Sequence, residues 1–422
     1  MKRYNERPSQ LMESELTSNS NGKNKIDFDE FDVEKYFLYW TILPGFTIKR
    51  SSLSLNLLIV LGSILIQCFA FVKYLILLIV GSDEFWIYWL GDITFNFGYA
   101  KDYCDLCFMI WAASTISAQL IFINSYLNNN LSWLKIFRLI GQRPPRKFVS
   151  NFERSVFLSI YPKVVIICKI GIYLLITTAT GIVLSSLIYL QKGLIYLITI
   201  GFVYGLISLA NCYITTVFVG LVSFIFSLVC HQYKLWVKLM DDYVHNYLIK
   251  RLDRSLPRSS HLKLYRFIIK EYGFFHNDLL HATKFWNRTI SGLFLGCSAS
   301  SVLVIYEYFF VDLDLVTTIA ITIFGLCTFI NGCLINVLAP ANLLHNFQRL
   351  IYPFHKLLTL DLPPGIKLGL IVVLDDIKAN QCFTCYRMFQ YNYSLILWLL
   401  LELSTFLLLL ISSKNGLANS VT

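Results

Sequence analysis

The carboxyl group of Glu402 lies in the middle of an apolar stretch, LILWLLLELSTFLLLLISS, at residues 395–413. An ionised carboxylate is costly in lipid, and acids within membrane segments usually face a helix-bundle interior or a water-filled cavity. With 100° between successive residues of a helix, one narrow polar stripe contains Ser394, Trp398, Glu402, Thr405, Leu409 and Ser412. The stripe therefore marks the side of this helix that avoids lipid.

Two interpretations of the polar stripe follow from its spacing. In the first, it packs against a neighbouring helix, where Glu402 is protonated or bonds to an amide such as Asn331 or Asn336. In the second, several copies of the helix surround an aqueous pore, and the resulting ring of carboxylates favours cations.

The composition predicts that membrane helices position this stripe. Hydrophobic residues make up 56% of the 422 residues and charged residues only 15%, whereas a soluble domain averages about 25% charged residues. Together with a mean hydropathy of +0.59, these values predict an all-α, polytopic membrane protein. The polar residues 1–52 have no apolar signal-peptide core and are expected to form a cytosolic tail.

Seven apolar segments are long enough to cross a bilayer: 53–80, 104–127, 164–190, 194–230, 289–311, 315–338 and 393–412. The run 164–230 could hold two helices or three, and the charge of its flanks decides. Segment 128–163 contains seven basic residues and one acid, and segment 231–288 contains eleven basic residues and five acids. The positive-inside rule places both in the cytosol, so an even number of crossings, two, separates them.

This topology places the amino terminus in the cytosol and residues 414–422 outside the cell. All but five of the 36 Lys and Arg residues then fall on the cytosolic side, the five being Lys73, Lys101, Lys169, Lys192 and Lys414. The net charge of +10 is thus explained by topology and contact with anionic lipid, and nucleic-acid binding has no support.

The cytosolic segments are expected to fold into helices of their own, within 231–288 and 339–391. One amphipathic stripe consists of Leu264, Ile268, Tyr272, Phe275 and Leu279, and a shorter one of Trp236, Met240, Val244 and Tyr247. Spans four and five are therefore predicted to continue into the cytosol and to pack there. A further helix is predicted within 366–378, after the helix-breaking sequence LPPG.

The carboxyl-terminal sequence resembles a known family. FTCYRMFQYNYSLI, residues 383–396, followed by STFLLLLISS, is similar to the signature of arthropod gustatory receptors, which reads Thr-Tyr, five hydrophobic residues, then Gln-Phe. Thr405 matches the Thr, Phe406 replaces the Tyr, and Ser412 with Ser413 replaces Gln-Phe. The length, seven spans, inverted orientation and long basic loop between spans four and five also resemble the insect gustatory and odorant receptor superfamily.

The resemblance implies a tetrameric ligand-gated cation channel of the plasma membrane, assembled from identical or related subunits. In such a channel the last helix, 393–413, lines the pore with the six stripe residues named above. The cytosolic helical extensions of the receptor domain, 53–413, form an anchor domain between subunits. Serine at position 412 implies a different constriction near the outer mouth, because serine is shorter than glutamine.

The resemblance also implies that a small tastant or odorant binds in the outer half of the helix bundle. A mostly apolar site with a few hydroxyl groups suits such a ligand. The candidate pocket residues are Trp111, Ser185, Tyr189, Tyr196, Tyr204, Tyr306, Glu307, Phe309, Thr318 and Thr322.

Other functions have less support in the sequence. The two C-x-x-C pairs, 104–107 and 382–385, fall on opposite membrane faces in this topology, so a four-thiolate zinc site is not expected. Catalytic motifs are absent, and neither an enzyme nor a cofactor is expected. A G-protein-coupled receptor would have the reverse orientation, and a secondary transporter that used Glu402 as an ion site would often show repeated halves.

Overall fold

The computed structural model describes residues 53–81, 83–92, 94, 101–127, 202–252, 258–310, 315–379 and 382–421, together with Ile170, Tyr173, Thr177 and Thr180. The predicted tail, most of the predicted span 164–190, and the pocket candidates Ser185, Tyr189 and Tyr196 lie outside these residues. The described chain is mostly helical, as the sequence predicts.

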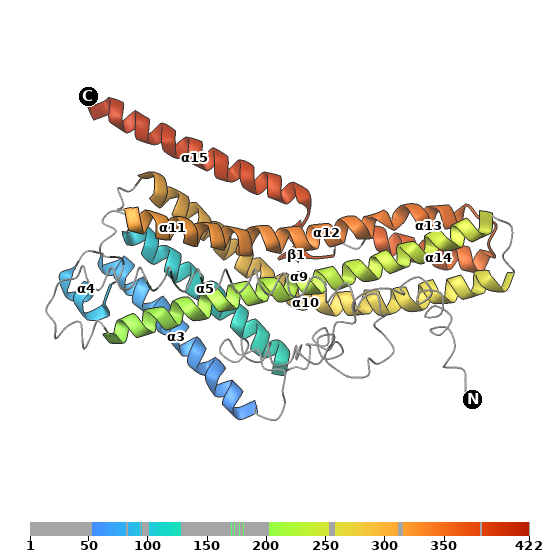
Figure 1. The fold of residues 1–422 in the computed structure, drawn as a ribbon, viewed down its shortest axis with the longest axis horizontal. Coiled ribbons are helices and arrows are strands. Elements are labelled where there is room, and N and C mark those ends of the chain that lie inside the picture. Colours follow the sequence, from blue (N-terminus) through green and yellow to red (C-terminus); the bar gives the residue numbers. More distant parts are fainter. Residues whose placement is uncertain are drawn as a thin grey trace, which may run out of the picture.

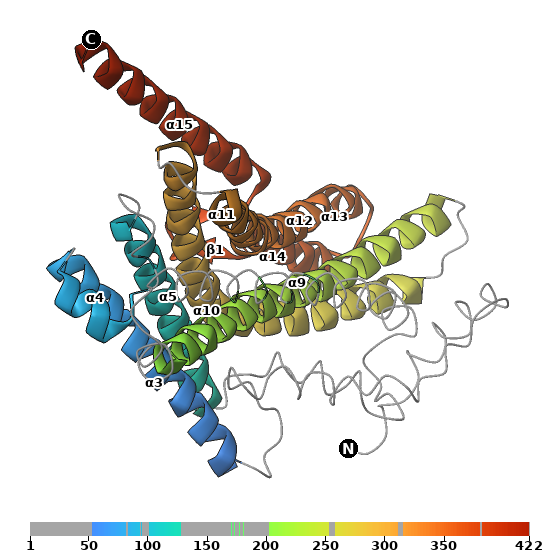
Figure 2. The same cartoon turned by 60° about the vertical axis from the view of Figure 1, so that its left-hand side comes forward.

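Two long helices lie close together at the end of the molecule where the first ends and the second begins, and they diverge toward the opposite end (Figures 1 and 2). Helix α9, Phe202–Leu252, has 51 residues, and α10, Arg258–Phe310, has 53. At 1.5 Å per residue each is nearly 80 Å long, whereas the bilayer core is about 30 Å thick. Both helices are therefore much longer than a bilayer core, which is consistent with the predicted continuation of spans four and five beyond the membrane.

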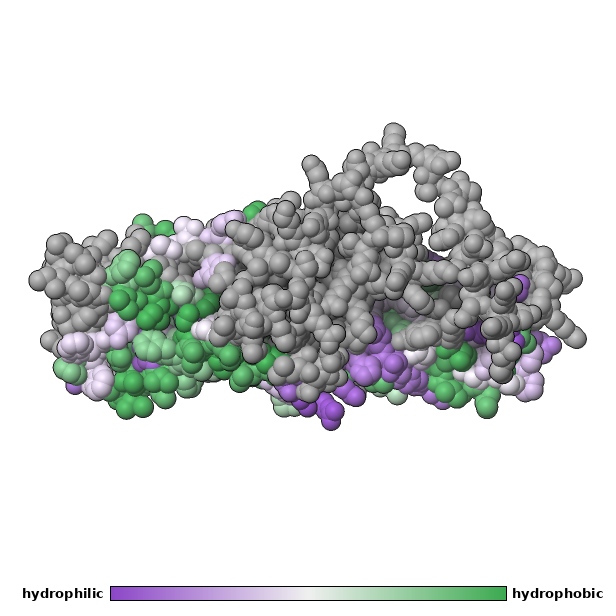
Figure 3. Space-filling model, turned by 90° about the horizontal axis from the view of Figure 1, so that it is seen from below, coloured by the Kyte–Doolittle hydropathy of each residue, from purple (hydrophilic) through white to green (hydrophobic). Residues whose placement is uncertain are grey.

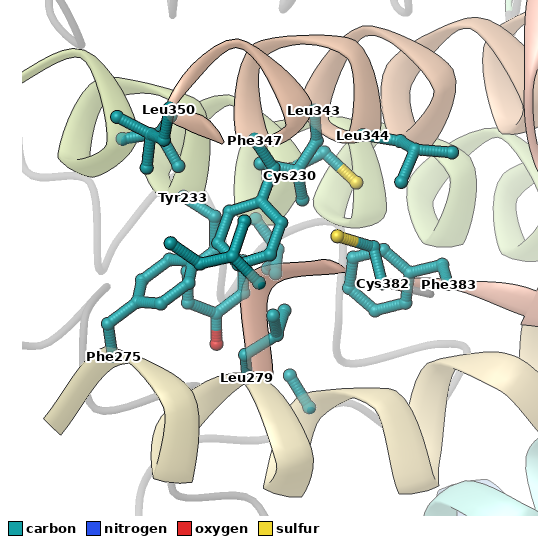
Figure 4. Packing of buried hydrophobic residues seen from close by; sticks show 14 of the residues in the cluster. Cys230, Tyr233, Phe275, Leu279, Leu343, Leu344, Phe347, Leu350, Cys382 and Phe383 are labelled. Carbon is teal, nitrogen blue, oxygen red and sulfur yellow. The ribbon is translucent and has the colours of Figure 1, made fainter. Parts of the chain in front are cut away.

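The parts of α9 and α10 beyond the expected membrane core pack with the helices that follow α11, and we call this packed unit the anchor region (231–288 and 339–391). Its other helices are α12, Asn336–Arg349, α13, Ile351–Leu358, and α14, Pro364–Ala379. All five residues of the longer predicted stripe are buried, Ile268 completely. The ring of Phe275 stacks on that of Trp236, with ring centres 4.0 Å apart. Its centre also lies 5.6 Å from that of Phe347, and both phenylalanines are visible in Figure 4.

The opposite end of the molecule contains the helices expected to lie in the membrane. These are α3, Leu53–Val80, the short α4, Glu84–Leu90, α5, Lys101–Leu127, the outer part of α10, and α11, Leu315–Thr328. Within the described residues, three segments are long and apolar enough to cross a membrane: Leu61–Val80, Lys101–Ser125 and Phe275–Phe309. Figure 3 shows apolar residues gathered over this end and hydrophilic residues toward the anchor region.

The predicted sixth span is one continuous rod with a change of helix type. A π-helical segment, η6, Phe329–Ile335, joins α11 to α12. Gly332 lies inside it, and a Cβ at this glycine would be 2.1 Å from the sulfur of Cys297 on α10. The absent side chain therefore lets η6 pack closely against α10.

The all-α prediction missed a short antiparallel hairpin between α14 and the last helix. Strand β1, Thr384–Cys385, pairs with β2, Phe389–Gln390, in the register Thr384 to Gln390 and Cys385 to Phe389. The last helix, α15, Tyr393–Val421, begins directly after this hairpin and projects away from the bundle toward its carboxyl end (Figures 1 and 2).

Candidate pore helix and ligand-binding end

The start of α15 is fixed by a side-chain cap. The backbone N–H of Leu395 donates to Oδ1 of Asn392 at 2.9 Å, which satisfies one of the free donors of the first helical turn. Three apolar side chains near this end, Leu395, Ile396 and Leu399, are partly buried against the main core. The base of α15 is thus held by the protein, whereas most side chains farther along are exposed.

The structure places the whole predicted polar stripe on exposed positions of α15. Trp398 is 63% and Leu409 64% exposed, and the same exposed class includes Ser394, Glu402, Thr405 and Ser412. The partly buried face of the helix is a different one, formed by Leu395, Ile396, Leu399, Leu403, Phe406 and Leu407. The stripe therefore does not pack against the described helices of its own chain.

An amide partner for Glu402 is not found within the described chain. Asn336 is fully buried, and its Nδ2 donates to the carbonyl oxygen of Gly332 at 3.0 Å, within its own rod. The side chain of Asn331 lies outside the described residues. Glu402 is instead available to water or to another chain.

The described candidates for the ligand pocket lie on four helices: α10 packs against both α5 and α11, whereas Tyr204 of α9 contacts α3 and the end of α4. The candidates are Trp111 on α5, Tyr204 on α9, Tyr306, Glu307 and Phe309 on α10, and Thr318 and Thr322 on α11. The Tyr306 ring lies 4.4 Å from that of Tyr103, and the Trp111 ring lies 4.5 Å from that of Phe324. Phe309 is 41% exposed, and the Thr322 hydroxyl donates to the carbonyl oxygen of Thr318.

Two of these candidates present buried polar atoms. Glu307 is only 2% exposed and accepts a hydrogen bond from the Cys104 thiol at 3.1 Å. The indole Nε1 of Trp111 is buried and has no hydrogen-bond partner among the described residues. A buried donor without a partner is costly, so this N–H is poised to bind an acceptor.

The side chain of Tyr204 is packed closely against Gly91 and Lys73. A Cβ at Gly91 would lie 2.8 Å from the Cβ of Tyr204, so this glycine makes the contact possible. Gly91 also has a left-handed φ of 56°, which ends α4. The ammonium group of Lys73 lies 5.3 Å from the centre of the Tyr204 ring.

A buried network of charges was missed by the sequence analysis. Lys101 pairs with Asp92 at 3.2 Å, and Lys73 donates to the carbonyl oxygen of Gly91 at 3.0 Å. The Thr94 hydroxyl oxygen lies 2.6 Å from Oδ1 of Asp92 and 2.8 Å from Oδ1 of Asp105, and the Thr94 backbone N–H donates to Asp92. The two lysines and two aspartates, formally opposite in charge, tie together α3, α4 and α5.

The cysteines are free thiols within the described chain and form no metal cluster there. Cys104 and Cys107 are on α5, whereas Cys382 and Cys385 belong to the hairpin segment. In Figure 4, Cys382 and Cys230 extend toward one another beside Phe383, in the core between α10 and the neighbouring helices α9 and α12. Cys230 and Cys382 thus act as small groups in an apolar core.

No protein-family model matches this sequence, and none of the curated proteins does. Solved structures do match. The insect olfactory receptor OR5 from Machilis hrabei has a TM-score of 0.68 and 10% sequence identity, over 90% of this chain and 98% of the receptor chain. The same receptor in complex with eugenol has a TM-score of 0.66, with the same identity and coverage. At 10% identity this likeness concerns the fold alone. The chain therefore has the fold of an insect olfactory receptor.

Proposed function

We propose that this chain is a subunit of a chemosensory, gustatory-type ligand-gated cation channel in the plasma membrane. The single observation that supports it most is the likeness to an insect olfactory receptor over 90% of this chain and 98% of that one. The proposal includes seven crossings, a cytosolic amino terminus and a pore lined by α15.

A tetrameric assembly explains why α15 stands apart from its own bundle. An exposed helix that bears both a carboxylate and many large apolar side chains is stable in a membrane when its two faces meet different surroundings. We propose that the stripe of Glu402 faces water shared with the equivalent helices of three other subunits. The broad apolar face then contacts lipid and neighbouring chains.

The proposed ligand is a small organic molecule bound at the outer end of the bundle. The neighbouring receptor was solved in complex with eugenol, which supports this ligand class. In this chain Trp111 offers a buried N–H to a ligand oxygen, and Tyr306, Glu307 and Phe309 lie on the adjacent helix α10. Tyr204, Thr318 and Thr322 belong to the same proposed site, as do Ser185, Tyr189 and Tyr196.

Patch recording from cells that express the full chain tests the proposal. Small organic molecules, eugenol among them, are applied one at a time, with antibody labelling to show that the chain reaches the surface. We expect ligand-evoked cation currents far above the rate of a carrier, which would separate a channel from a transporter. The absence of evoked current across the set, with the chain at the surface, would contradict the proposal.

The contribution of Trp111 is tested on an active ligand. Trp111→Phe keeps an aromatic ring but removes the N–H, so a ligand acceptor loses its partner. The half-maximal ligand concentration is expected to rise about tenfold, the equivalent of one hydrogen bond of ~1.4 kcal/mol. Trp236→Phe, in the anchor region, is the matched control and is expected to leave this concentration unchanged.

A further inference from the structure

The hairpin before α15 is docked on α10 by a pair of reciprocal hydrogen bonds. Nδ2 of Asn287 donates to the Thr384 hydroxyl at 3.0 Å, and Oδ1 of Asn287 accepts from the backbone N–H of Thr384 at 3.1 Å. A single amide thus holds both the side chain and the backbone of one β1 residue. Such a two-point contact fixes orientation as well as distance.

A second contact lies one helical turn farther along the same face of α10. The Ser291 hydroxyl accepts from the backbone N–H of Tyr386 at 3.0 Å and donates to the carbonyl oxygen of Asn287. The spacing of four residues places both side chains on one face of the helix. Gly292 next to them leaves room for the Tyr386 ring, whose hydroxyl would lie 3.2 Å from a Cβ at that position.

The backbone of the hairpin needs these contacts because its own geometry is unfavourable. Cys382, Tyr386 and Arg387 have φ values of 51°, 45° and 64°, in the left-handed region that residues other than glycine rarely adopt. The two backbone N–H groups bound by Asn287 and Ser291 belong to this segment. The helix α10 therefore holds the chain in a conformation that it would not keep alone.

The hairpin is also the element that leads directly into α15. Its Tyr391 is 1% exposed and packs against Phe294 of α10, with ring centres 5.9 Å apart. Asn392 then caps α15, and farther along most side chains of α15 are exposed. In Figures 1 and 2, α15 leaves the bundle at the hairpin and diverges from it.

From this arrangement we infer that Asn287 and Ser291 are positioning residues for opening of the proposed pore: they clamp the hairpin to α10 and transmit movements of α10 to the base of α15. The effect on pore opening rests on the proposed channel function, whereas the contact between the hairpin and α10 does not. Helix α10 is continuous from Arg258 to Phe310, so the same rod contains the clamp and the proposed ligand-binding residues Tyr306 and Glu307. A shift or rotation of this rod moves β1 through the two bound N–H groups.

The test combines hydrogen–deuterium exchange with current recording on the full chain. The variants are Asn287→Ala, Ser291→Ala and Thr384→Val, which replaces the hydroxyl of threonine with a methyl group. Thr384→Ser, which keeps a hydroxyl, and Asn277→Ala, at an exposed position of the same helix, are the controls. Gel filtration shows which variants are folded, and Thr384→Val remains informative if Asn287→Ala is not.

We expect the three clamp variants to exchange the amides of the hairpin about fivefold to tenfold faster than the parent chain, because each loses a hydrogen bond that opposes opening. We also expect a shift of at least about threefold in the half-maximal ligand concentration or in the ligand-free open probability. The two control variants should match the parent chain in both measurements.

If the hairpin amides exchange at the same rate in the clamp variants as in the parent chain, Asn287 and Ser291 do not hold the hairpin on α10, whatever the currents show. Faster exchange with an unchanged ligand response and open probability would overturn its role in gating. If the parent chain itself passes no current under any condition, the proposed channel function fails, while the exchange data still decide whether α10 holds the hairpin.

Discussion

At the scale of single residues, the anchor region contains a polar contact between α10 and α14. The Tyr272 hydroxyl donates to Asp376, and Nδ1 of His276 lies 2.9 Å from the same carboxylate. The pKa of Tyr272 is raised above its usual value, mainly because the phenol is buried and secondly because it donates a hydrogen bond to Asp376. The folded chain therefore keeps this proton at a pH where the unfolded chain releases it, and stability falls as pH rises above about 10.

Tyr272→Phe is expected to lower the free energy of unfolding by ~1 kcal/mol near neutral pH, because the buried ring stays and one hydrogen bond is lost. Above about pH 10 the variant should lose stability less steeply than the parent chain. The reason is that phenylalanine lacks the phenol proton, which the folded parent chain keeps and the unfolded parent chain releases. Thermal unfolding of the purified chain at both pH values is the measurement. Tyr352→Phe, 67% exposed on α13, serves as the control, and an equal loss in both variants would contradict the assignment.

At the scale of elements, regular periodicity was enough to predict most of the helices. The stripe of Leu264, Ile268 and Tyr272 predicts the buried face of α10, and the structure confirms it. The hairpin could not be predicted in this way, because none of its three left-handed residues is a glycine or an asparagine. The π-helical segment η6 likewise has no sequence periodicity of its own.

The contact between η6 and α10 makes a prediction about Gly332. Gly332→Ala would place a Cβ 2.1 Å from the Cys297 sulfur and 2.3 Å from its Cβ. Relieving this overlap requires backbone movement, so we expect a loss of ~1–3 kcal/mol in stability.

Gly62→Ala in α3 is the matched control, since nothing lies within 4 Å of a Cβ there. The thermal midpoint of this control should stay equal or rise, because alanine favours helix more than glycine does. Equal midpoints for Gly332→Ala and the parent chain would show that η6 and α10 are not packed as described.

At the scale of the whole molecule, the candidate site was only partly predictable. The polar stripe of α15 follows from spacing alone, because its six residues belong to one helix. The buried network of Lys73, Asp92, Lys101 and Asp105 could not be predicted from spacing, because these residues come from separate segments of the chain that only the fold brings together. Glu307 was predicted as a candidate, but its partner Cys104 could be identified only from the fold.

The proposed orientation of the molecule predicts which terminus is outside the cell. An epitope tag at the amino terminus should be labelled only after the membrane is made permeable, and a tag at the carboxyl terminus should be labelled on intact cells. The reason is the concentration of Lys and Arg in the segments assigned to the cytosol. Labelling of the amino-terminal tag on intact cells would contradict this orientation and favour the topology of a G-protein-coupled receptor.

If the exposed stripe of α15 lines a path for cations, as we propose, the permeability of the channel should change in Glu402→Gln. The ratio of calcium to sodium permeability, taken from reversal potentials, is compared among the parent chain, Glu402→Gln and Asp375→Asn, whose exposed acid lies on α14. We predict that Glu402→Gln lowers this ratio about fivefold, the equivalent of ~1 kcal/mol of attraction across water, and that Asp375→Asn leaves it unchanged. Equal ratios in all three would show that Glu402 does not face the ion path and that the stripe of α15 does not line it.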